Sequence, residues 1–543
     1  MNRYNVLITI LSALCSLLPA LLYSQSVDTA WVRTYNGPAN GVDGGRAIAV
    51  DEQGNVYVTG ISIGSGTYMD YATVKYNSAG VEQWARRYNG PGNAWDWVKA
   101  IAVDGQGNVY VTGGVAAGGY DDYGTIKYNS NGDTLWVRRY NGPGNAGDGA
   151  SALAVDGQGN VYVTGGSSGS GTSLDYATIK YNSAGDTLWV RRYNGPGNGS
   201  DWTYSLAVDG QGNVYVTGES YGSGGSDDYV TIKYNSAGVE QWTQRYNGPG
   251  NDDDWALVIA VDGQSNVYVT GYSVGSGSYA DYATIKYNAN GDTLWVRRYN
   301  GPGNSDDEDN SLAVDGQGNV YVTGESYGSG TAYDYATIKY NSAGVQEWVQ
   351  RYNGPGNGDD WAYSLAVDGS GNVYVTGYSI GTSPDYATIK YNSSGVQQWV
   401  QRYNGPGNDD DEASALAVDD SGNVYVTGYS AVSSTNADFA TIKYVQTQGI
   451  EEIASLPLAK TSGVEVYPNP VKSFFVVRIP SSIKRQTLKM FDVSGKLVKE
   501  IDSPSAHNDK VAEMRVSLKG IKPGVYFVQV GDEMVKEKLV VTK

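Results

Sequence analysis

An all-β fold of four-stranded sheets arranged around one axis is predicted by three observations. Glycine and tyrosine are abundant, at 73 and 46 of 543 residues, as expected for a turn-rich β protein. Successive copies of one hexapeptide lie 51 to 53 residues apart, which fits one propeller blade and exceeds one solenoid hairpin. The hexapeptide, Asn-Val-Tyr-Val-Thr-Gly, begins at Asn55, Asn108, Asn160, Asn213, Asn266, Asn319, Asn372 and Asn423. We therefore predict an eight-bladed β-propeller over residues 29–444.

Each repeat contains four strand-like segments, as residues 84–128 illustrate. The segment WARRY at 84–88 ends at the turn sequence NGPGN, and AIAV at 100–103 ends at the hairpin sequence DGQGN. Asp and Gly supply the side-chain bonds and positive φ that such turns require. VYVT at 109–112 and YGTIKY at 123–128 complete the set, joined by a Gly-rich loop. Apolar residues occupy both faces of these strands, so neighbouring sheets are expected to cover both.

The two ends of the array predict how the ring closes. Residues 29–35 (TAWVRTY) repeat the Trp-containing strand, and residues 438–444 (DFATIKY) repeat the last strand of a blade. If the Ala-Val strand is innermost, the last blade lacks its outermost strand. The N-terminal strand can supply it, which closes the ring and leaves no open sheet edge.

The N-terminal 24 residues have the organisation of a signal peptide. Arg3 precedes an apolar run from Val6 to Leu22, and Ser24-Gln25 follows as a cleavage site. Cys15, the only cysteine, lies in this segment, so the mature chain is expected to have no disulfide or thiol chemistry. No other segment reaches the roughly 18 apolar residues of a membrane helix. We expect an exported protein with no transmembrane segment after cleavage.

Composition divides the chain near residue 450. Residues 451–543 hold 15 Lys and Arg against 11 Asp and Glu, whereas the preceding residues hold 23 against 46. All 13 Trp precede residue 400, and four of the five Phe follow residue 470. We predict a linker at 445–462 and a second domain at 463–543. The acidic array argues against nucleic acid as a partner, because phosphates would be repelled.

The repeat resembles a known bacterial family. VDGQGNVYVTG, DYATIKYN and WVRRYNGPGN, which recur through residues 29–444, are similar to the extracytoplasmic β-propeller repeats called SBBP repeats. The resemblance implies a fold and no particular activity. The family name implies seven blades, whereas this chain has eight copies of the motif.

The C-terminal part resembles another family. VEVYPNP at 464–470, LKMFDVSGK at 488–496, GIKPGVYFV at 520–528 and KLVV at 538–541 are similar to the type A sorting domain of the type IX secretion system. The resemblance implies a small antiparallel β-sandwich and the type IX machinery as a partner. It also implies a secreted protein, or one held on the cell surface by anchoring to the outer membrane.

The residues available for catalysis are few. His507 is the only histidine and lies in the C-terminal part, which excludes a Ser-His-Asp triad or a histidine metal site in the array. Only carboxylate chemistry remains, and most acids recur in every blade. We therefore expect no enzymatic activity and predict a binding or adhesion module for glycans or proteins. We also expect the protein to be a monomer. The alternatives are a carbohydrate-active hydrolase or lyase using loop carboxylates, and a structural component of the surface or matrix.

Three sets of aspartates recur once per blade. The set beginning at Asp51 lies in the tight hairpins and is expected to bond turn amides. The set beginning at Asp70 precedes the last strand of each blade and could pair with strand lysines such as Lys75 and Lys127. The set beginning at Asp43 lies in the loop between blades, three residues after the Asn of the turn GPxN.

The loops between blades form the predicted ligand-binding surface, because sequence variation concentrates there. Aromatic faces beside carboxylates are typical of sugar sites, although these tryptophans could instead fill the gaps between blades. The candidate ligand-binding residues are Trp95, Trp97, Trp202, Trp255, Trp361, Asp254, Asp307, Asp360 and Asp411.

Calcium is the one candidate cofactor. Clustered acids provide the oxygen ligands that this ion prefers, although no D-x-D-x-D-G loop is present and solvated acidic loops are the alternative. The residues considered are Asp252, Asp253, Asp306, Asp309, Asp409 and Asp410.

Overall fold

A computed structural model describes most of the propeller and parts of the C-terminal region. The described residues are 25–277, 279–433, 436–448, 465–467, 474–479, 487–492, 497–502, 512–518, 521–522, 524–530 and 533–541. The chain divides into two compact units, residues 1–450 and 451–543. The predicted signal peptide at 1–24 lies outside the described residues, as does the part of the predicted linker after residue 448.

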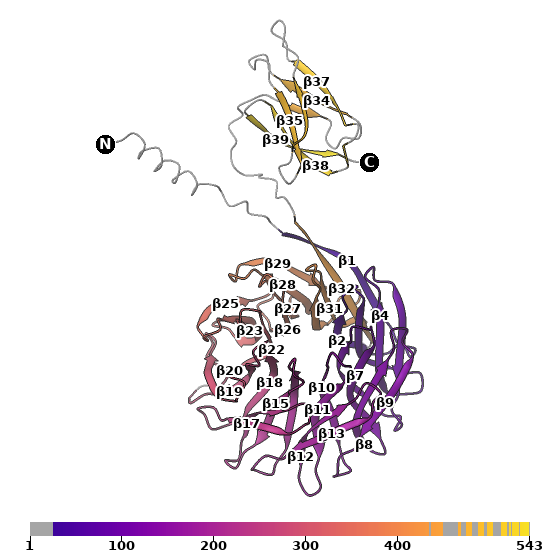
Figure 1. Cartoon of the computed structure of the whole chain (residues 1–543), viewed down its shortest axis with the longest axis vertical. Helices are drawn as coiled ribbons and strands as arrows, with labels where there is room; N and C mark the ends of the chain where they lie inside the picture. Colours follow the sequence, from indigo (N-terminus) through magenta and orange to yellow (C-terminus); the bar gives the residue numbers. More distant parts are fainter. Residues whose placement is uncertain are drawn as a thin grey trace, which may run out of the picture. The chain divides into compact units, whose positions relative to one another are not determined.

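The first unit is an eight-bladed β-propeller, as predicted (Figure 1). The innermost strands of successive blades contact one another around the ring. They are β2 (Asp43–Val50), β6 (Trp97–Val103), β10 (Asp148–Val155), β14 (Asp201–Val208), β18 (Asp254–Val261), β22 (Asp307–Val314), β26 (Asp360–Val367) and β30 (Asp411–Val418).

The second strands carry the repeated hexapeptide, and their Val-Tyr-Val segments are fully buried. They are β3 (Val56–Ile63), β7 (Val109–Ala117), β11 (Val161–Ser168), β15 (Val214–Tyr221), β19 (Val267–Val274), β23 (Val320–Tyr327), β27 (Val373–Ile380) and β31 (Val424–Ser433).

The third and outermost strands complete each antiparallel sheet. The third strands are β4 (Met69–Tyr76), β8 (Tyr120–Tyr128), β12 (Leu174–Tyr181), β16 (Asp227–Tyr234), β20 (Ala280–Tyr287), β24 (Tyr333–Tyr340), β28 (Pro384–Tyr391) and β32 (Asn436–Gln448). The outermost strands are β5 (Glu82–Tyr88), β9 (Thr134–Tyr140), β13 (Thr187–Tyr193), β17 (Glu240–Tyr246), β21 (Thr293–Tyr299), β25 (Gln346–Tyr352), β29 (Gln397–Tyr403) and, for the eighth blade, β1 (Gln25–Tyr35).

The ring closes through the N-terminal strand, as the sequence predicts. In the eighth blade the strand order is β1-β32-β31-β30, and Val32 lies opposite Ile442. β32 continues to Gln448, which pairs with Gln25, so this sheet extends four residues beyond the predicted boundary at 444. Trp31 packs in one cluster with Phe439 of the eighth blade and Val58 of the first, so one hydrophobic core joins the two ends of the array.

Each blade is also tied to the next by polar contacts. The Trp242 indole N–H donates to the Ala289 carbonyl of the following blade at 3.2 Å, and Lys233 Nζ donates to the same carbonyl at 2.9 Å. The buried Tyr229 hydroxyl donates to the Ala283 carbonyl at 3.1 Å. Because these partners lie in the neighbouring blade, a single blade would leave them unsatisfied in its own sheet.

The hairpin aspartates bond turn amides, as predicted. Asp104 Oδ1 accepts from the backbone N–H groups of Gln106 and Asn108, both at 2.9 Å. Its Oδ2 accepts from the Asn108 amide and the Tyr110 hydroxyl, both at 2.8 Å. Burial alone would raise the pKa of Asp104, but these hydrogen bonds lower it below its ordinary value.

The second unit consists of two small antiparallel sheets in its described residues. One contains β33 (Glu465–Tyr467), β34 (Phe474–Ile479) and β37 (Ala512–Ser517). The other contains β36 (Leu497–Asp502), β35 (Thr487–Asp492), β38 (Gly524–Val530) and β39 (Glu533–Val541) in that order. Leu488, Met490 and Val516 are fully buried, as expected for a small β domain with its own core.

Closure can be tested by substituting Trp31. We expect Trp31→Ala to destabilise the propeller by about 3–5 kcal/mol, since a buried tryptophan is lost, and to make residues 25–35 sensitive to protease. Trp84→Ala, at the equivalent position of blade 1, is the control: it should lower the melting temperature comparably without exposing the N-terminal strand. Equal protease resistance of residues 25–35 in the two variants would contradict closure by the N-terminal strand.

Candidate functional site

The third set of aspartates begins the innermost strands and is buried. Asp254 is fully buried; its Oδ2 accepts from the Gly248 N–H at 2.5 Å and its Oδ1 from the Val274 N–H at 3.2 Å. Burial raises the pKa of Asp254, although these hydrogen bonds oppose the rise. Asp307, Asp360 and Asp411 are equally buried and bond the equivalent glycines. All four carboxylates are thus engaged with backbone and have no surface to offer a ligand.

Three of the acids considered as calcium ligands connect neighbouring blades. Asp253 Oδ1 accepts from the Asp227 N–H at 3.0 Å, and Asp306 Oδ1 accepts from the Ala280 N–H at 3.2 Å. Asp309 is fully buried and accepts from the Thr270 hydroxyl of the preceding blade. Within the described ranges, no three Asp, Glu, His or Cys side chains are grouped so that they could hold a metal ion. Calcium binding at the acids named above stays a prediction.

The aspartates near the start of the third strands pair with arginine, so the predicted pairing with strand lysines was wrong. Arg87 Nη2 lies 2.8 Å from Asp70 Oδ2, and the equivalent pairs recur in the following blades. Lys75 instead donates to the Ser130 carbonyl at 3.1 Å and lies over the Tyr57 ring. Register explains the difference, because Lys75 lies opposite Trp84, far along the strand from Asp70.

Three of the candidate tryptophans pack between blades. Trp202 donates to the Ser151 hydroxyl of the preceding blade at 2.8 Å and leaves no room for a side chain at Gly166. Trp255 stacks on Tyr204 of the preceding blade with ring centroids 6.2 Å apart, and the Trp361 ring centroid lies 6.1 Å from that of Tyr333, also of the preceding blade. Each occupies the second position of its innermost strand. All three are half-buried, so they fill gaps between blades and present only part of their rings.

Trp95 and Trp97 belong to a more exposed arrangement at the junction of blades 1 and 2. Trp95 lies 5.3 Å from Trp97 and 6.5 Å from Tyr68, with which it is stacked. Trp95 is 45% exposed and Tyr68 56% exposed. The Asp96 N–H donates to the Met69 carbonyl at 2.8 Å, which holds the two contributing loops together. We call Tyr68, Trp95 and Trp97 the aromatic platform, and the face formed by these loops the loop face.

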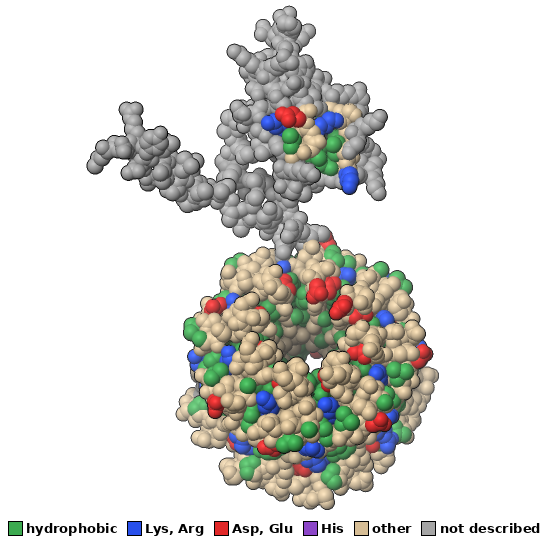
Figure 2. All heavy atoms as spheres, in the orientation of Figure 1, with side chains coloured by type: hydrophobic (Ala, Val, Ile, Leu, Met, Phe, Trp, Pro, Cys, Tyr) green, Lys and Arg blue, Asp and Glu red, His purple; other side chains and the backbone are tan. Residues whose placement is uncertain are grey.

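Figure 2 shows an opening at the centre of the ring. The innermost strands around it differ from blade to blade at one position. We count positions of the innermost strands from the repeated aspartate, Asp43 in blade 1 and Asp96 in blade 2. At the fourth position, blades 1 and 2 have exposed cations, Arg46 and Lys99. The other blades have partly buried side chains there, namely Ser151, Tyr204, Leu257, Asn310, Tyr363 and Ser414.

Acids that are not repeated in every blade lie on the opposite arc. Tyr204 donates to Glu219 Oε2 at 2.7 Å, and Asn310 Nδ2 donates to Glu325 Oε2 at 2.5 Å. Burial raises the pKa of Glu219 to about 7. Burial, with the nearby Glu308 carboxylate, raises the pKa of Glu325 to about 8.

Sequence reasoning missed Tyr68, Arg46, Lys99, Glu219 and Glu325. Tyr68 lies in a Gly-rich loop, and its contact with Trp95 depends on how two blades meet. The other four occupy positions at which the repeats differ from one another. That departure from the repeat is the signal by which they could have been found.

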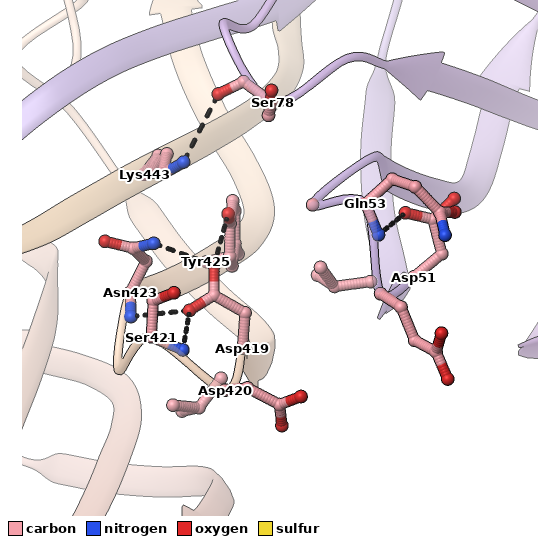
Figure 3. A pocket seen from close by; sticks show the side chains of 13 residues that line it. Asp51, Gln53, Ser78, Asp419, Asp420, Ser421, Asn423, Tyr425 and Lys443 are labelled. Atoms are coloured by element: carbon pink, nitrogen blue, oxygen red, sulfur yellow. Dashed lines mark hydrogen bonds between the residues drawn. The ribbon is translucent and has the colours of Figure 1, made fainter.

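A polar cavity of about 340 Å³ lies between the hairpins of blades 8 and 1. Figure 3 shows the Asp51 hairpin opposite the hairpin of Asp419 and Asp420, with Lys443 donating to the Ser78 carbonyl. The hydrogen bonds of Asp51 and Asp419 stay within their own hairpins. None of the residues predicted to bind ligand lines this cavity.

Two family models match this chain. The β-propeller repeat family SBBP matches residues 83–113, 188–225, 241–277, 294–330, 347–383 and 398–439. The secretion system C-terminal sorting domain matches residues 465–542. No helix of the described residues is long and apolar enough to span a membrane.

Curated relatives match only part of the chain. An uncharacterized WD repeat-containing protein of Acanthamoeba polyphaga mimivirus is 24% identical over 273 residues, which is 42% of this chain and 18% of that protein. The regulatory protein FlaEY of Caulobacter vibrioides is 35% identical over 114 residues, 18% of this chain and 11% of that protein. The chain therefore spans less than a fifth of the length of either relative.

Solved structures with similar folds are distant in sequence. A quinohemoprotein alcohol dehydrogenase from Pseudomonas putida HK5 is 12% identical with a TM-score of 0.48, covering 84% of this chain and 80% of that one. Sqt1 from Chaetomium thermophilum is 10% identical with a TM-score of 0.47, covering 77% and 98%.

The fold and the family matches define the class of protein. The chain is an exported eight-bladed β-propeller. More particularly, it is a protein of SBBP-type repeats with a type IX sorting domain at its C-terminus, which directs export to the cell surface or secretion.

The buried aspartates can be tested by substitution. Asp254→Ala leaves the Gly248 and Val274 N–H groups without acceptors, so we expect a loss of about 2–4 kcal/mol in the free energy of unfolding. Asp252→Ala, on an exposed neighbour, should change it by less than about 0.5 kcal/mol. Urea unfolding of the two variants measures the difference. Similar stabilities for both would contradict the structural role of Asp254.

The buried Glu325 predicts a pH dependence of stability. Its folded pKa of about 8 lies above the ordinary value of 4.5, so the folded state holds the proton more tightly than the unfolded state. Stability should therefore fall as pH rises from about 4.5 to about 8. Melting temperatures across this range should fall less steeply for Glu325→Gln, which retains the acceptor for Asn310. Identical slopes for the variant and the unmodified protein would contradict the raised pKa.

Proposed function

We propose that this protein is a surface or secreted binding module that holds glycans on its loop face through the aromatic platform. The observation that carries the proposal is the exposure of Trp95 and Tyr68, at 45% and 56%, in a stacked arrangement. Contiguous exposed apolar surface is common at interaction sites, and here the two exposed rings adjoin one another. Aromatic rings combined with polar groups are suited to sugars, which present an apolar ring face edged by hydroxyls.

The position of the platform supports this proposal. Blades 3 to 8 lack an aromatic residue at the position of Trp95; they have Gly147, Ser200, Asp253, Asp306, Asp359 and Asp410 instead. In three of these blades the aspartate accepts a backbone N–H of the preceding blade. Trp95 replaces that structural bond with an exposed ring. A departure from the repeat that gives up a tie between blades favours a role in binding.

The non-repeated acids favour binding over catalysis. A glycosidase needs two accessible carboxyl groups on either side of a sugar. Glu325 is 5% exposed and bonded to Asn310, and Glu219 is bonded to Tyr204. These carboxyl groups are occupied within the propeller wall. Export by the type IX pathway, with retention at the outer membrane as a proposed final location, would place the loop face among extracellular glycans.

Trp95→Ser tests the proposal, because serine occupies the equivalent position at Ser200 and the change should not disturb the fold. We expect at least a tenfold loss of affinity for glycans captured on an array, as loss of one stacking ring costs roughly 1–3 kcal/mol. Leu294→Gln is the control: it removes an exposed apolar side chain from an outermost strand, where Gln83, Gln241 and Gln398 are equivalent.

Two outcomes would count against the proposal. Equal glycan binding by the unmodified protein and Trp95→Ser would remove the platform as the site. Release of new reducing ends or unsaturated sugars from a bound polysaccharide would contradict the non-enzymatic part and favour the carbohydrate-active alternative.

A further inference from the structure

We propose that the bound glycan is anionic, and that Arg46 and Lys99 hold its carboxylate or sulfate group at the mouth of the central channel beside the aromatic platform. This inference rests on the proposed function and specifies its ligand class.

Among the eight residues at the fourth position of the innermost strands, Arg46 and Lys99 are exposed and the other six are partly buried. These strands surround the centre of the ring, so a side chain exposed from the middle of one reaches solvent through the central opening (Figure 2). The charge of Arg46 acts on Lys99 in blade 2, Tyr363 in blade 7 and Glu412 in blade 8. These effects reach blades on both sides of blade 1, which agrees with a guanidinium exposed toward the central opening.

The two cations have no anionic partner of their own. Neither makes a hydrogen bond or an ion pair with the residues that the structure describes, although most other arginines of the propeller do so. The charge of Arg46 acts on Glu412, but the Glu412 carboxylate accepts a hydrogen bond from the Tyr429 hydroxyl at 3.3 Å and makes no ion pair with Arg46. Partial desolvation and the Arg46 charge lower the pKa of Lys99. Two like charges placed together without a counterion form a binding site for an anion.

The repeat places this pair beside the aromatic platform. Between other blades, the second-position residue packs against the fourth-position residue of the preceding blade: Trp202 bonds Ser151, and Trp255 stacks on Tyr204. By the same relation we expect Trp97 of blade 2 to lie beside Arg46 of blade 1. Lys99 follows Trp97 by two residues on β6, roughly 7 Å along the strand. A sugar stacked on the platform can therefore present an acid group to both cations.

The acidic side chains elsewhere around the opening would repel an anion and so restrict it to the side of Arg46 and Lys99. Across the opening, the walls of blades 4 and 6 carry Glu219, Glu308 and Glu325. The propeller as a whole is strongly acidic, so non-specific attraction cannot hold a polyanion, and binding must come from short-range contacts at Arg46 and Lys99. Such contacts weaken as salt is added, because charges exposed to solvent are screened.

The test compares two pairs of polysaccharides that differ in charge: polygalacturonate against its fully methyl-esterified form, and carrageenan against agarose. We expect the full-length protein to bind at least one charged member about tenfold or more tightly than its neutral counterpart. A preference for polygalacturonate over its ester would identify a carboxylate as the bound group, and a preference for carrageenan over agarose would identify a sulfate. Arg46→Ser with Lys99→Ser should abolish this excess, and serine is the residue present at Ser151 and Ser414. Arg86→Gln with Arg138→Gln also removes two positive charges and matches Gln244, Gln350 and Gln401 on outermost strands, so this double variant controls for net charge.

The outcomes separate this inference from the proposed function. A charged-over-neutral preference that survives Arg46→Ser with Lys99→Ser, or one that Arg86→Gln with Arg138→Gln removes equally, overturns the anion site. Equal binding of charged and neutral members, still lost in Trp95→Ser, overturns the anion site and leaves the glycan-binding module standing. Failure to bind any of the four polymers, or binding unaffected by Trp95→Ser, counts against both.

Discussion

Every blade depends on its neighbours to cover the two faces of its sheet, and this mutual cover organises the molecule. The cores are shared: Tyr215 and Tyr229 of blade 4 pack in one cluster with Val267 and Ile285 of blade 5. Burying four strands on both faces requires a neighbour on each side, so the array is stable only as a closed circle. The Trp31 cluster closes it, and the same constraint fixes the residues at every contact between blades.

Because each blade packs against its neighbours, some positions of the repeat hold the same residue in every blade, whereas others differ between blades. The hairpin aspartates and those that begin the innermost strands satisfy buried or turn amides, and all eight blades retain them. Residues at the loop face and around the opening are not the same in every blade. There the blades differ, with cations and the aromatic platform on one side and acids on the other. Departures from the repeat are therefore more informative about function than the repeat itself.

Periodicity was sufficient to predict the blade count, the four strands and the closing strand, because these follow from spacing and from the unpaired ends of the array. The hairpin role of Asp51 followed from turn chemistry. The burial of Asp254 could not be predicted from the sequence, because only the folded loop shows that the Gly248 and Val274 N–H groups donate to its carboxylate. The partner of Asp70 depended on strand register, and the contact of Tyr68 with Trp95 on the packing of two blades.

The innermost strands explain how one propeller can hold different chemistry around its opening. In each of them the pairing with the second strand shifts between the third and fifth positions counted from the repeated aspartate, as between Gly45 and Ala47 or Val98 and Ala100. The fourth residue is the extra residue of a β-bulge, which leaves the ladder and can redirect its side chain. Substituting Arg46 or Lys99 therefore disturbs no paired position. A site built on these residues can change its charge while the sheets that carry it remain the same.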